Sequence, residues 1–223
     1  MAHIPHPPAA PGTALLAGGS GLIGRELAAL WPGPGTLYLL LRRPLPTRAN
    51  QRVHVVDFNA LPALPLAHDA YCCLGTTLKV AGSPEAFRAV DLDAVLAFAQ
   101  AAQAAGVQRF AVVSALGADP GSRQLYNRTK GEMEQALREM AFERLVIARP
   151  SLLTGAREAL GQPPRRAEAL ALALTRPLAP LIPAAWRPIA ARTVARALLR
   201  ALAQDGPAVQ VLESSELQTL GQA

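Results

Sequence analysis

The chain alternates short apolar runs with longer segments whose apolar residues recur at helical spacing. Most of these runs do not alternate apolar with polar residues, so they favour strands buried on both faces of a parallel sheet over strands with one wet face. The runs are Thr13–Ala17, Thr36–Leu41, Arg52–Val56, Ala70–Leu74, Gln108–Val113 and Leu145–Ala148.

The segments between the runs predict helices that cross from one strand to the next. Ser83, Pro84 and Glu85 have the N-cap, first-position and acidic first-turn chemistry of a helix start, so we expect a long helix from Ser83 to about Ala105. Because strands and helices alternate, the strands should be parallel with right-handed connections. Other expected elements are a helix opening near Leu22, helices over 124–140, 165–175 and 193–203, and a last short strand over 209–212.

The first strand runs directly into a glycine-rich turn. Gly19, Gly21 and Gly24 match a dinucleotide fingerprint, and Gly18, Gly21 and Gly24 give a three-residue spacing. Glycines let the backbone approach a pyrophosphate, and the amides and dipole of the helix start favour its charge. The alternative is a glycine-rich turn without a ligand, but a strand before and a helix after favour a dinucleotide site. The expected contacts are Gly18, Ser20, Gly21, Leu22, Ile23 and Gly24.

This pattern predicts an α/β fold: a Rossmann-type doubly wound parallel sheet of about six to seven strands with helices on both faces. We expect a flexible, proline-rich tail over 1–12 that lacks the features of a signal peptide, and a single domain over 13–223. Within it, 156–208 is predicted to form a small substrate-side or lid region. The proline-interrupted stretch there could close over a substrate, contact another subunit or simply pack.

Arg42 and Arg43 follow the second strand, where an NAD-binding fold usually places an acidic residue. Guanidinium groups suit a 2′-phosphate, so the pair favours NADP over NAD, unless it is only a surface pair at a strand end. Asp57, after the third strand, could accept a hydrogen bond from adenine or cap its own loop. The loop after the fourth strand should line the same cleft. Further expected cofactor contacts are Leu74, Gly75, Thr76, Thr77, Tyr126, Lys130 and Arg149.

Tyr126 and Lys130 lie four residues apart, so they share one helix face. A lysine ammonium beside a phenol should lower the pKa of the phenol, which could then exchange a proton with a carbonyl or alcohol oxygen. Lys130 could also bind the nicotinamide ribose. Ser114, at the end of the fifth predicted strand, could hold the reacting oxygen. A tyrosine and lysine at this spacing are often a surface pair, but their placement after a serine-ending strand favours a catalytic set of Ser114, Tyr126 and Lys130.

The composition of the chain disfavours several classes of protein and of binding site. The 223 residues are 51% hydrophobic and 17% charged, which indicates a globular chain, and the net charge of +6 is scattered with only 4% aromatics, which disfavours nucleic-acid binding. Adjacent Cys72 and Cys73 would form a strained disulfide, so both should be reduced, which suggests a cytoplasmic protein. The four histidines are not spaced as metal ligands, and no apolar run is long enough to span a membrane.

These residues resemble the short-chain dehydrogenase/reductase superfamily. The spacing Gly18-x-x-Gly21-x-x-Gly24 is similar to its extended or atypical branch. Within it, the segments 72–77, 112–119 and 125–132 and the Arg42-Arg43 pair most resemble the Tat-interacting-protein-like oxidoreductases. The resemblance runs from Thr13 to Pro150 and continues more loosely through the C-terminal third. It implies a Rossmann fold, bound NADPH and a Ser-Tyr-Lys set. Ala115 is a departure, because relatives often carry a second hydroxyl there.

We therefore expect an NADP(H)-dependent oxidoreductase that transfers a hydride to or from a small carbonyl or alcohol substrate. NAD(H) is the less favoured cofactor. The alternative is a non-catalytic NADPH-binding regulatory or redox-sensing protein, since the family includes such members. No metal, nucleic acid or membrane partner is expected, and the sequence leaves a homodimer open.

Overall fold

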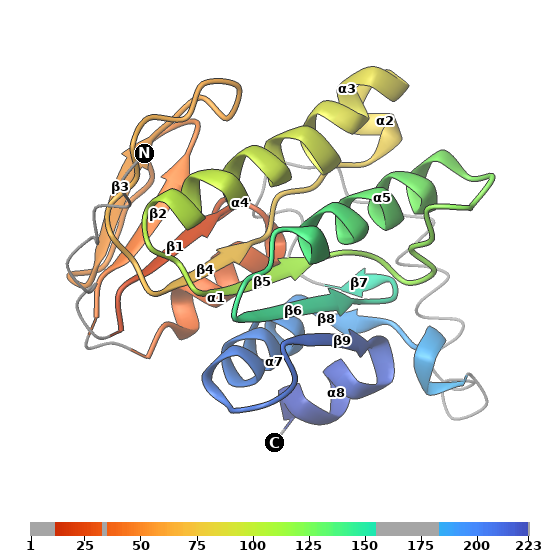
Figure 1. Cartoon of the computed structure of the whole chain (residues 1–223). Helices are drawn as coiled ribbons and strands as arrows, with labels where there is room; N and C mark the ends of the chain where they lie inside the picture. Colours follow the sequence, from red (N-terminus) through yellow and green to blue (C-terminus); the bar gives the residue numbers. More distant parts are fainter. Residues whose placement is uncertain (1–11, 33–34, 155–182, 223) are drawn as a thin grey trace.

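The computed structural model describes residues 12–32, 35–154 and 183–222, and it contains a seven-stranded parallel sheet (Figure 1). The strand order is β3-β2-β1-β4-β5-β6-β9, and every neighbouring pair is parallel. This confirms the predicted doubly wound α/β fold. The strands are β1 (Ala14–Ala17), β2 (Leu37–Leu41), β3 (Gln51–Val55), β4 (Asp69–Cys72), β5 (Arg109–Val113), β6 (Arg144–Arg149) and β9 (Val209–Glu213).

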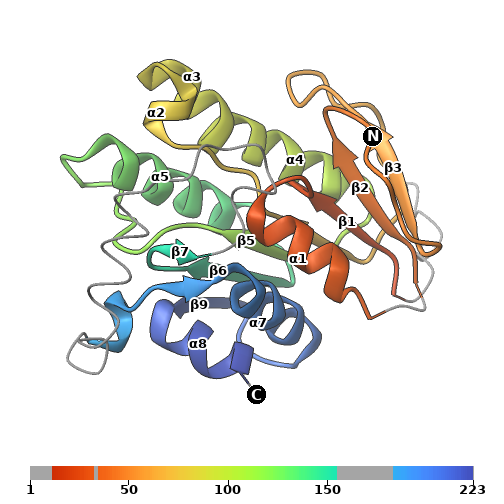
Figure 2. The ribbon, with the colours of Figure 1, turned by 180° about the vertical axis from the view of Figure 1, so that it is seen from behind.

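Helices cover both faces of the sheet. Helices α4 (Ala94–Ala104) and α5 (Leu125–Glu139) lie on one face, and α1 (Leu22–Leu30), α7 (Ala191–Ala203) and α8 (Ser214–Gln222) lie on the other (Figure 1). Seen from behind, α1 and α7 lie side by side against the sheet (Figure 2). The shorter helices are α2 (Leu78–Ala81), α3 (Pro84–Arg88), the π-helix η1 (Ala89–Asp93) and the 3₁₀-helix η4 (Ala184–Trp186).

The apolar strands are buried because each face of the sheet has its own core. All four residues of β1 are fully buried. Ala14 and Leu16 join the core under α1 and α7, whereas Leu15 and Ala17 join the core under α4 and α5. Successive side chains of a strand point to opposite faces, so a strand covered on both faces needs apolar residues at every position.

The strand order reverses direction between β1 and β4, the point at which such sheets bind ligands. β1 pairs with β2 on one side and with β4 on the other. The glycine-rich turn follows β1, and the loop from Cys73 to Thr77 follows β4, so both lie at the carboxyl end of the sheet. The fold therefore places the predicted cofactor segments next to each other.

Several details differ from the predicted elements. The long helix expected from Ser83 to Ala105 is divided by one wide π turn, η1, between α3 and α4. Helix α8 and a small parallel sheet of β7 (Leu153–Thr154) and β8 (Ile189–Ala190) were not predicted. Such short elements carry too little periodicity to be recognised locally.

Part of the predicted organisation stays a prediction. The expected helix 165–175 and all but Gly12 of the expected tail lie outside the described residues, as do 156–182 of the expected lid region. Later in that region, α7 packs its buried face against α1 and the sheet. Over the described residues, no helix has both the length and the apolar character needed to span a bilayer.

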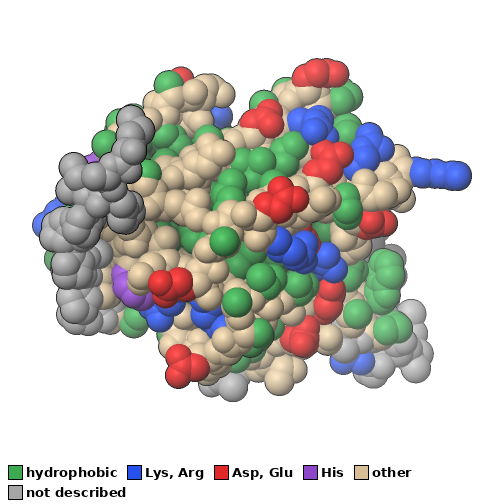
Figure 3. Space-filling model, viewed as in Figure 1, with side chains coloured by type: hydrophobic (Ala, Val, Ile, Leu, Met, Phe, Trp, Pro, Cys, Tyr) green, Lys and Arg blue, Asp and Glu red, His purple; other side chains and the backbone are tan. Residues whose placement is uncertain are grey.

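Acidic and basic side chains are interspersed on the face shown in Figure 3. They mix most densely over α3 and the start of α5, where Arg88 pairs with Glu132 at 2.5 Å. Arg128 lies 3.9 Å from the same carboxylate. The described part of this face is therefore not a uniformly basic surface.

Candidate functional site

The glycine-rich turn is a tight backbone cradle closed on itself. Gly18 has a φ of +81°, which disfavours any side chain, and its carbonyl accepts a hydrogen bond from the Gly21 amide at 3.0 Å. Helix α1 then starts at Leu22, with no side-chain cap and no acidic residue in its first turn. The first amides of α1 and its positive dipole end are thus left for an anion, which fits a dinucleotide pyrophosphate.

The loop after β4 lies directly against this turn, as predicted. A Cβ on Gly18 would lie 2.4 Å from the carbonyl group of Cys73 and 2.7 Å from the amide nitrogen of Leu74. Within the loop, the Thr77 hydroxyl accepts a hydrogen bond from the Val80 amide and so caps α2. The amide of Thr76 donates at 2.8 Å to the carboxylate of Asp91. The loop is therefore held between the glycine turn and η1.

Tyr126 and Lys130 both lie in the first half of α5, close to this loop. The Tyr126 ring packs against the ring of Phe87, with centroids 5.5 Å apart. The Lys130 Nζ atom lies 2.7 Å from Asp91 Oδ1 and 3.7 Å from where a Cβ on Gly75 would be. The glycine turn, the loop after β4 and the Tyr-Lys helix are thus connected through contacts at one end of the sheet.

The electrostatics of Tyr126 differ from the prediction. Burial raises the pKa of Tyr126 above 10.0, the nearby Lys130 charge lowers it and the Asp91 charge raises it, with a net increase. The expectation that Lys130 lowers this pKa considered the ammonium alone, without the burial of the phenol or the buried carboxylate. Tyr126 is therefore a phenol, a proton donor, at neutral pH.

The hydroxyl of Ser114 already has a buried partner. It donates a 2.6 Å hydrogen bond to Glu134 Oε1 on α5, and only 4% of Ser114 is exposed. The structure gives no hydrogen bond between the described side chains of Ser114 and Tyr126. This geometry does not favour the predicted oxygen-holding role, because the hydroxyl joins β5 to α5.

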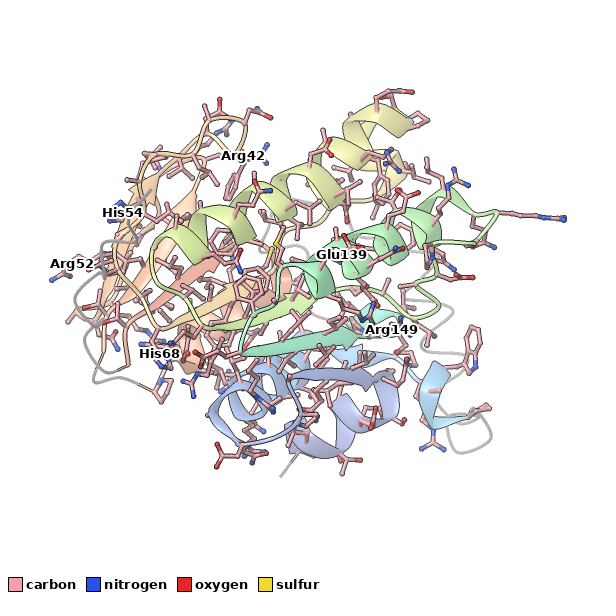
Figure 4. All side chains as sticks on the ribbon, viewed as in Figure 1. Arg42, Arg52, His54, His68, Glu139 and Arg149 are labelled. Atoms are coloured by element: carbon pink, nitrogen blue, oxygen red, sulfur yellow. The ribbon has the colours of Figure 1, made fainter. Side chains whose placement is uncertain are left out.

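Arg149 also uses its guanidinium within the protein. Its Nε and Nη2 atoms donate to the two oxygens of Glu134 at 2.9 and 2.7 Å, and Nη1 donates to Glu213 at 3.0 Å. These hydrogen bonds raise the pKa of Arg149. Figure 4 shows Arg149 near the tip of β6, beside α5. The predicted cofactor contact of Arg149 is therefore disfavoured, because its donors are occupied by carboxylates.

The residues expected to contact the adenosine end of the cofactor differ in whether they have a partner within the protein. Arg42 and Arg43 are exposed, and neither has a hydrogen bond or ion pair to another described residue. They follow Leu41, whose side chain lies 3.4 Å from where a Cβ on Gly19 would be. Asp57, in contrast, accepts hydrogen bonds at 2.9 Å from the amide and the side chain of Asn59. Of the two roles considered for Asp57, the geometry favours the local cap.

Asp91 and Glu134 are two buried acidic residues on the helices beside the candidate site that the sequence interpretation missed. The side chain of each is only 1% exposed. A signal was present, because each occupies an apolar helical stripe: Asp91 falls between Phe87 and Val95, and Glu134 is followed three residues later by Leu137. A carboxylate in such a stripe indicates a buried charge that needs a partner.

Comparison with known proteins places the chain among named relatives. Protein HTATIP2 of Rattus norvegicus is 37% identical over 180 residues, which cover 77% of this chain and 71% of that protein. Protein FMP52, mitochondrial, of Eremothecium gossypii is 37% identical over 152 residues, covering 65% of this chain and 68% of that protein. No protein-family model matches the chain.

Solved structures share the fold at low sequence identity. MoeE5 in complex with UDP-glucose and NAD has a TM-score of 0.70 and 20% identity, covering 90% of this chain and 75% of that chain. The ADP-L-glycero-D-manno-heptose-6-epimerase of Helicobacter pylori has a TM-score of 0.67 and 15% identity, with 90% and 76% covered. These similarities support the Rossmann-like fold.

The prediction of a cytoplasmic location is wrong by this comparison. FMP52 relatives, including that of Coccidioides immitis at 31% identity over 166 residues, are named mitochondrial proteins. The two cysteines are indeed free. However, free thiols only disfavour an oxidising compartment and do not distinguish among the compartments that keep thiols reduced.

The family follows from the relatives and the fold together. HTATIP2 exceeds 30% identity over more than two thirds of its own length. The strand order and the glycine turn are those expected for an extended short-chain dehydrogenase/reductase. The chain therefore belongs to the Tat-interacting-protein-like family of NAD(P)-binding oxidoreductases, within the atypical or extended branch of the short-chain dehydrogenase/reductase superfamily.

Proposed function

We propose that this chain is an NADP(H)-dependent oxidoreductase that interconverts a small carbonyl compound and its alcohol. The observation that carries the proposal is the contact of Lys130 with the Gly75 loop, which itself packs on the glycine turn. This contact brings a tyrosine–lysine pair to the carboxyl end of the sheet, beside an uncapped helix start. Sheets of this kind bind dinucleotides at that end.

The residues present fit a nicotinamide dinucleotide. The turn from Gly18 to Gly24 and the first amides of α1 would hold the pyrophosphate, and the Leu74–Thr77 loop with Lys130 would contact ribose. MoeE5, which shares the fold, is described in complex with NAD. When bound, such a cofactor supplies or accepts a hydride.

The residues that follow β2 favour NADP over NAD as the cofactor. Arg42 and Arg43 are exposed and without a described partner, and no acidic residue stands between Leu41 and Gln51 to bind a 2′-hydroxyl. A planar guanidinium binds phosphate through charge-assisted hydrogen bonds. These two residues would therefore recognise the 2′-phosphate.

Tyr126 is the proposed proton-transfer residue. Its phenol would donate the proton to the carbonyl oxygen during reduction, or accept it during alcohol oxidation. Lys130 would orient the ribose and carry positive charge beside the phenol. Ser114 has no proposed contact with substrate, because its hydroxyl is bound to Glu134.

Cofactor binding and turnover test the proposal separately. We expect the purified chain to bind NADPH more tightly than NADH, and to oxidise NADPH with members of a broad panel of aldehydes and ketones. Tyr126→Phe should abolish turnover with NADPH affinity unchanged. The absence of NADPH oxidation across the panel, or full activity of Tyr126→Phe, would contradict the catalytic proposal.

A second candidate function is a non-catalytic NADPH-binding regulator. It is favoured by one observation, namely that no free hydroxyl from Ser114 is left to hold a reacting oxygen. In that case NADPH would bind and protect the fold against heat without turnover, and Tyr126→Phe would change neither property. The absence of nucleic-acid binding stays a prediction, which a gel-shift assay would test. Size-exclusion chromatography would show whether the chain forms a homodimer.

A further inference from the structure

Asp91 is a buried carboxylate that joins three elements at the edge of the candidate site. Its side chain is 1% exposed. Oδ1 lies 2.7 Å from Lys130 Nζ on α5, and Oδ2 accepts the Thr76 amide of the loop after β4 at 2.8 Å. One oxygen is thus ion-paired and the other accepts a hydrogen bond, so the buried carboxylate fixes the positions of Lys130 and Thr76 relative to one another.

The π turn η1 buries Asp91 and leaves the nearby Asp93 exposed. The turn η1 covers Ala89–Asp93 and packs against α3 and α5. Asp91 and Leu92 are buried within it, whereas Asp93 is exposed. Wide turns of this kind are frequent at functional sites. The local helix geometry therefore directs one of two neighbouring aspartates toward Lys130.

The Lys130 ammonium depends on this carboxylate. Its side chain is 3% exposed, and burial alone would lower its pKa, but the nearby Asp91 carboxylate and Tyr126 raise the pKa overall. The Cys72 thiol of β4 also faces Lys130, and burial raises its pKa to about 12, so it stays neutral at physiological pH. Asp91 is thus the carboxylate that compensates the ammonium.

The other charged groups around Tyr126 do not compensate the Lys130 ammonium as Asp91 does. Arg88 of α3 is paired with Glu132 of α5, and Arg128 is near the same glutamate. The remaining charged side chains of α2, α3 and η1, namely Lys79, Glu85 and Asp93, are exposed to solvent. Charges in water are screened far more than a buried pair.

We propose that Asp91 is a positioning residue that compensates the Lys130 charge beside the buried Tyr126, and so acts together with burial to keep Tyr126 protonated, which adapts the site to carbonyl reduction. This inference rests on the proposed function for the role of Tyr126. In the reducing direction, the carbonyl carbon would take a hydride from bound NADPH, which would leave as NADP+, while the C=O π bond opens. Its oxygen takes the phenolic proton, which gives the alcohol and leaves a tyrosinate that solvent reprotonates. The opposite reaction would need the phenolate, which Asp91 disfavours.

The test is a spectroscopic titration of the cofactor-free full-length chain. Phenolate formation at Tyr126 is followed by ultraviolet absorbance, with Tyr126→Phe versions subtracted to remove Tyr38 and Tyr71. Asp91→Asn should retain an acceptor for the Thr76 amide and lose the charge, so the Tyr126 midpoint should fall by about one pH unit or more. Asp93→Asn, the exposed neighbour, should leave the midpoint unchanged. An unchanged or higher midpoint in Asp91→Asn would overturn the proposal.

A second variant keeps the test decisive if Asp91→Asn does not fold. Asp91→Asn combined with Lys130→Met removes both charges, so the Tyr126 midpoint should stay close to that of the parent chain. A midpoint raised by about one pH unit or more would show that Lys130 acts on Tyr126 without compensation and would overturn the proposal.

The turnover measurement distinguishes the two proposals. If carbonyl reduction is observed, the alkaline limb of its pH–rate profile should move to lower pH in Asp91→Asn. If no carbonyl is reduced, the proposed function fails, whereas the titration still decides the role of Asp91.

Discussion

Gly24 packs so closely on Gly18 that a Cβ on Gly24 would lie 2.2 Å from the Gly18 carbonyl oxygen. The atoms that this Cβ would meet are backbone atoms, which cannot move aside as a flexible side chain could. Gly24→Ala should therefore lower the free energy of unfolding by about 1–3 kcal/mol or more, measured by chemical denaturation. At Gly21 a Cβ would make only an ordinary 3.4 Å contact. Gly21→Ala should fold nearly normally and weaken NADPH binding. A Gly24→Ala variant as stable as the parent would contradict this packing.

Ser114→Ala tests whether the serine serves structure or chemistry. Losing its hydrogen bond to Glu134 should cost about 0.5–1.5 kcal/mol of stability, because Arg149 still satisfies that carboxylate. We expect kcat to remain within a few-fold of the parent. A fall in kcat of about 100-fold with unchanged stability would instead support an oxygen-holding role.

The cofactor end of the site was predictable from the sequence because its signals are local. The strand, the glycines from Gly18 to Gly24 and the start of α1 are contiguous, and the Arg42-Arg43 pair follows the next strand directly. The apolar runs likewise predicted the sheet, since strands covered on both faces need apolar residues throughout. Those inferences required no knowledge of distant contacts.

The partners of the chemical groups could not be predicted in the same way. Ser114 and Glu134 are twenty residues apart, and Lys130 and Asp91 are farther apart, on different elements. The spacing of Tyr126 and Lys130 indicated their common face but not the buried carboxylate that changes the electrostatics of the phenol. The π turn also breaks the regular 3.6-residue period, so a straight helix from Ser83 to Ala105 was the wrong geometry for Asp91.

Arg42→Ala and Arg43→Ala test the cofactor preference. Each should weaken NADPH binding by about 10-fold or more through the loss of a charge-assisted hydrogen bond, and should leave NADH affinity unchanged. Arg52→Ala is the matched control, because Arg52 is also exposed but donates to the carbonyls of Ala49 and Gln51. Figure 4 shows Arg52 well apart from Arg42. Equal loss of NADPH and NADH affinity, or equal affinities in the parent chain, would contradict the NADP assignment.

The Arg149–Glu134 pair should contribute strongly to the stability of the Tyr126 helix. Glu134 is 1% exposed and Arg149 22%, so removing the guanidinium leaves a buried carboxylate with Ser114 and the more distant Arg138, at 3.2 Å, as its remaining partners. Arg149→Ala should therefore lower the free energy of unfolding by about 3–5 kcal/mol. Arg149→Met combined with Glu134→Gln removes both charges and should be more stable than Arg149→Ala alone, since no unpaired charge stays buried. Chemical denaturation of the three proteins measures this order. Equal stability of Arg149→Ala and the parent would show that water or Arg138 compensates Glu134, and that the pair does not hold α5 against β6.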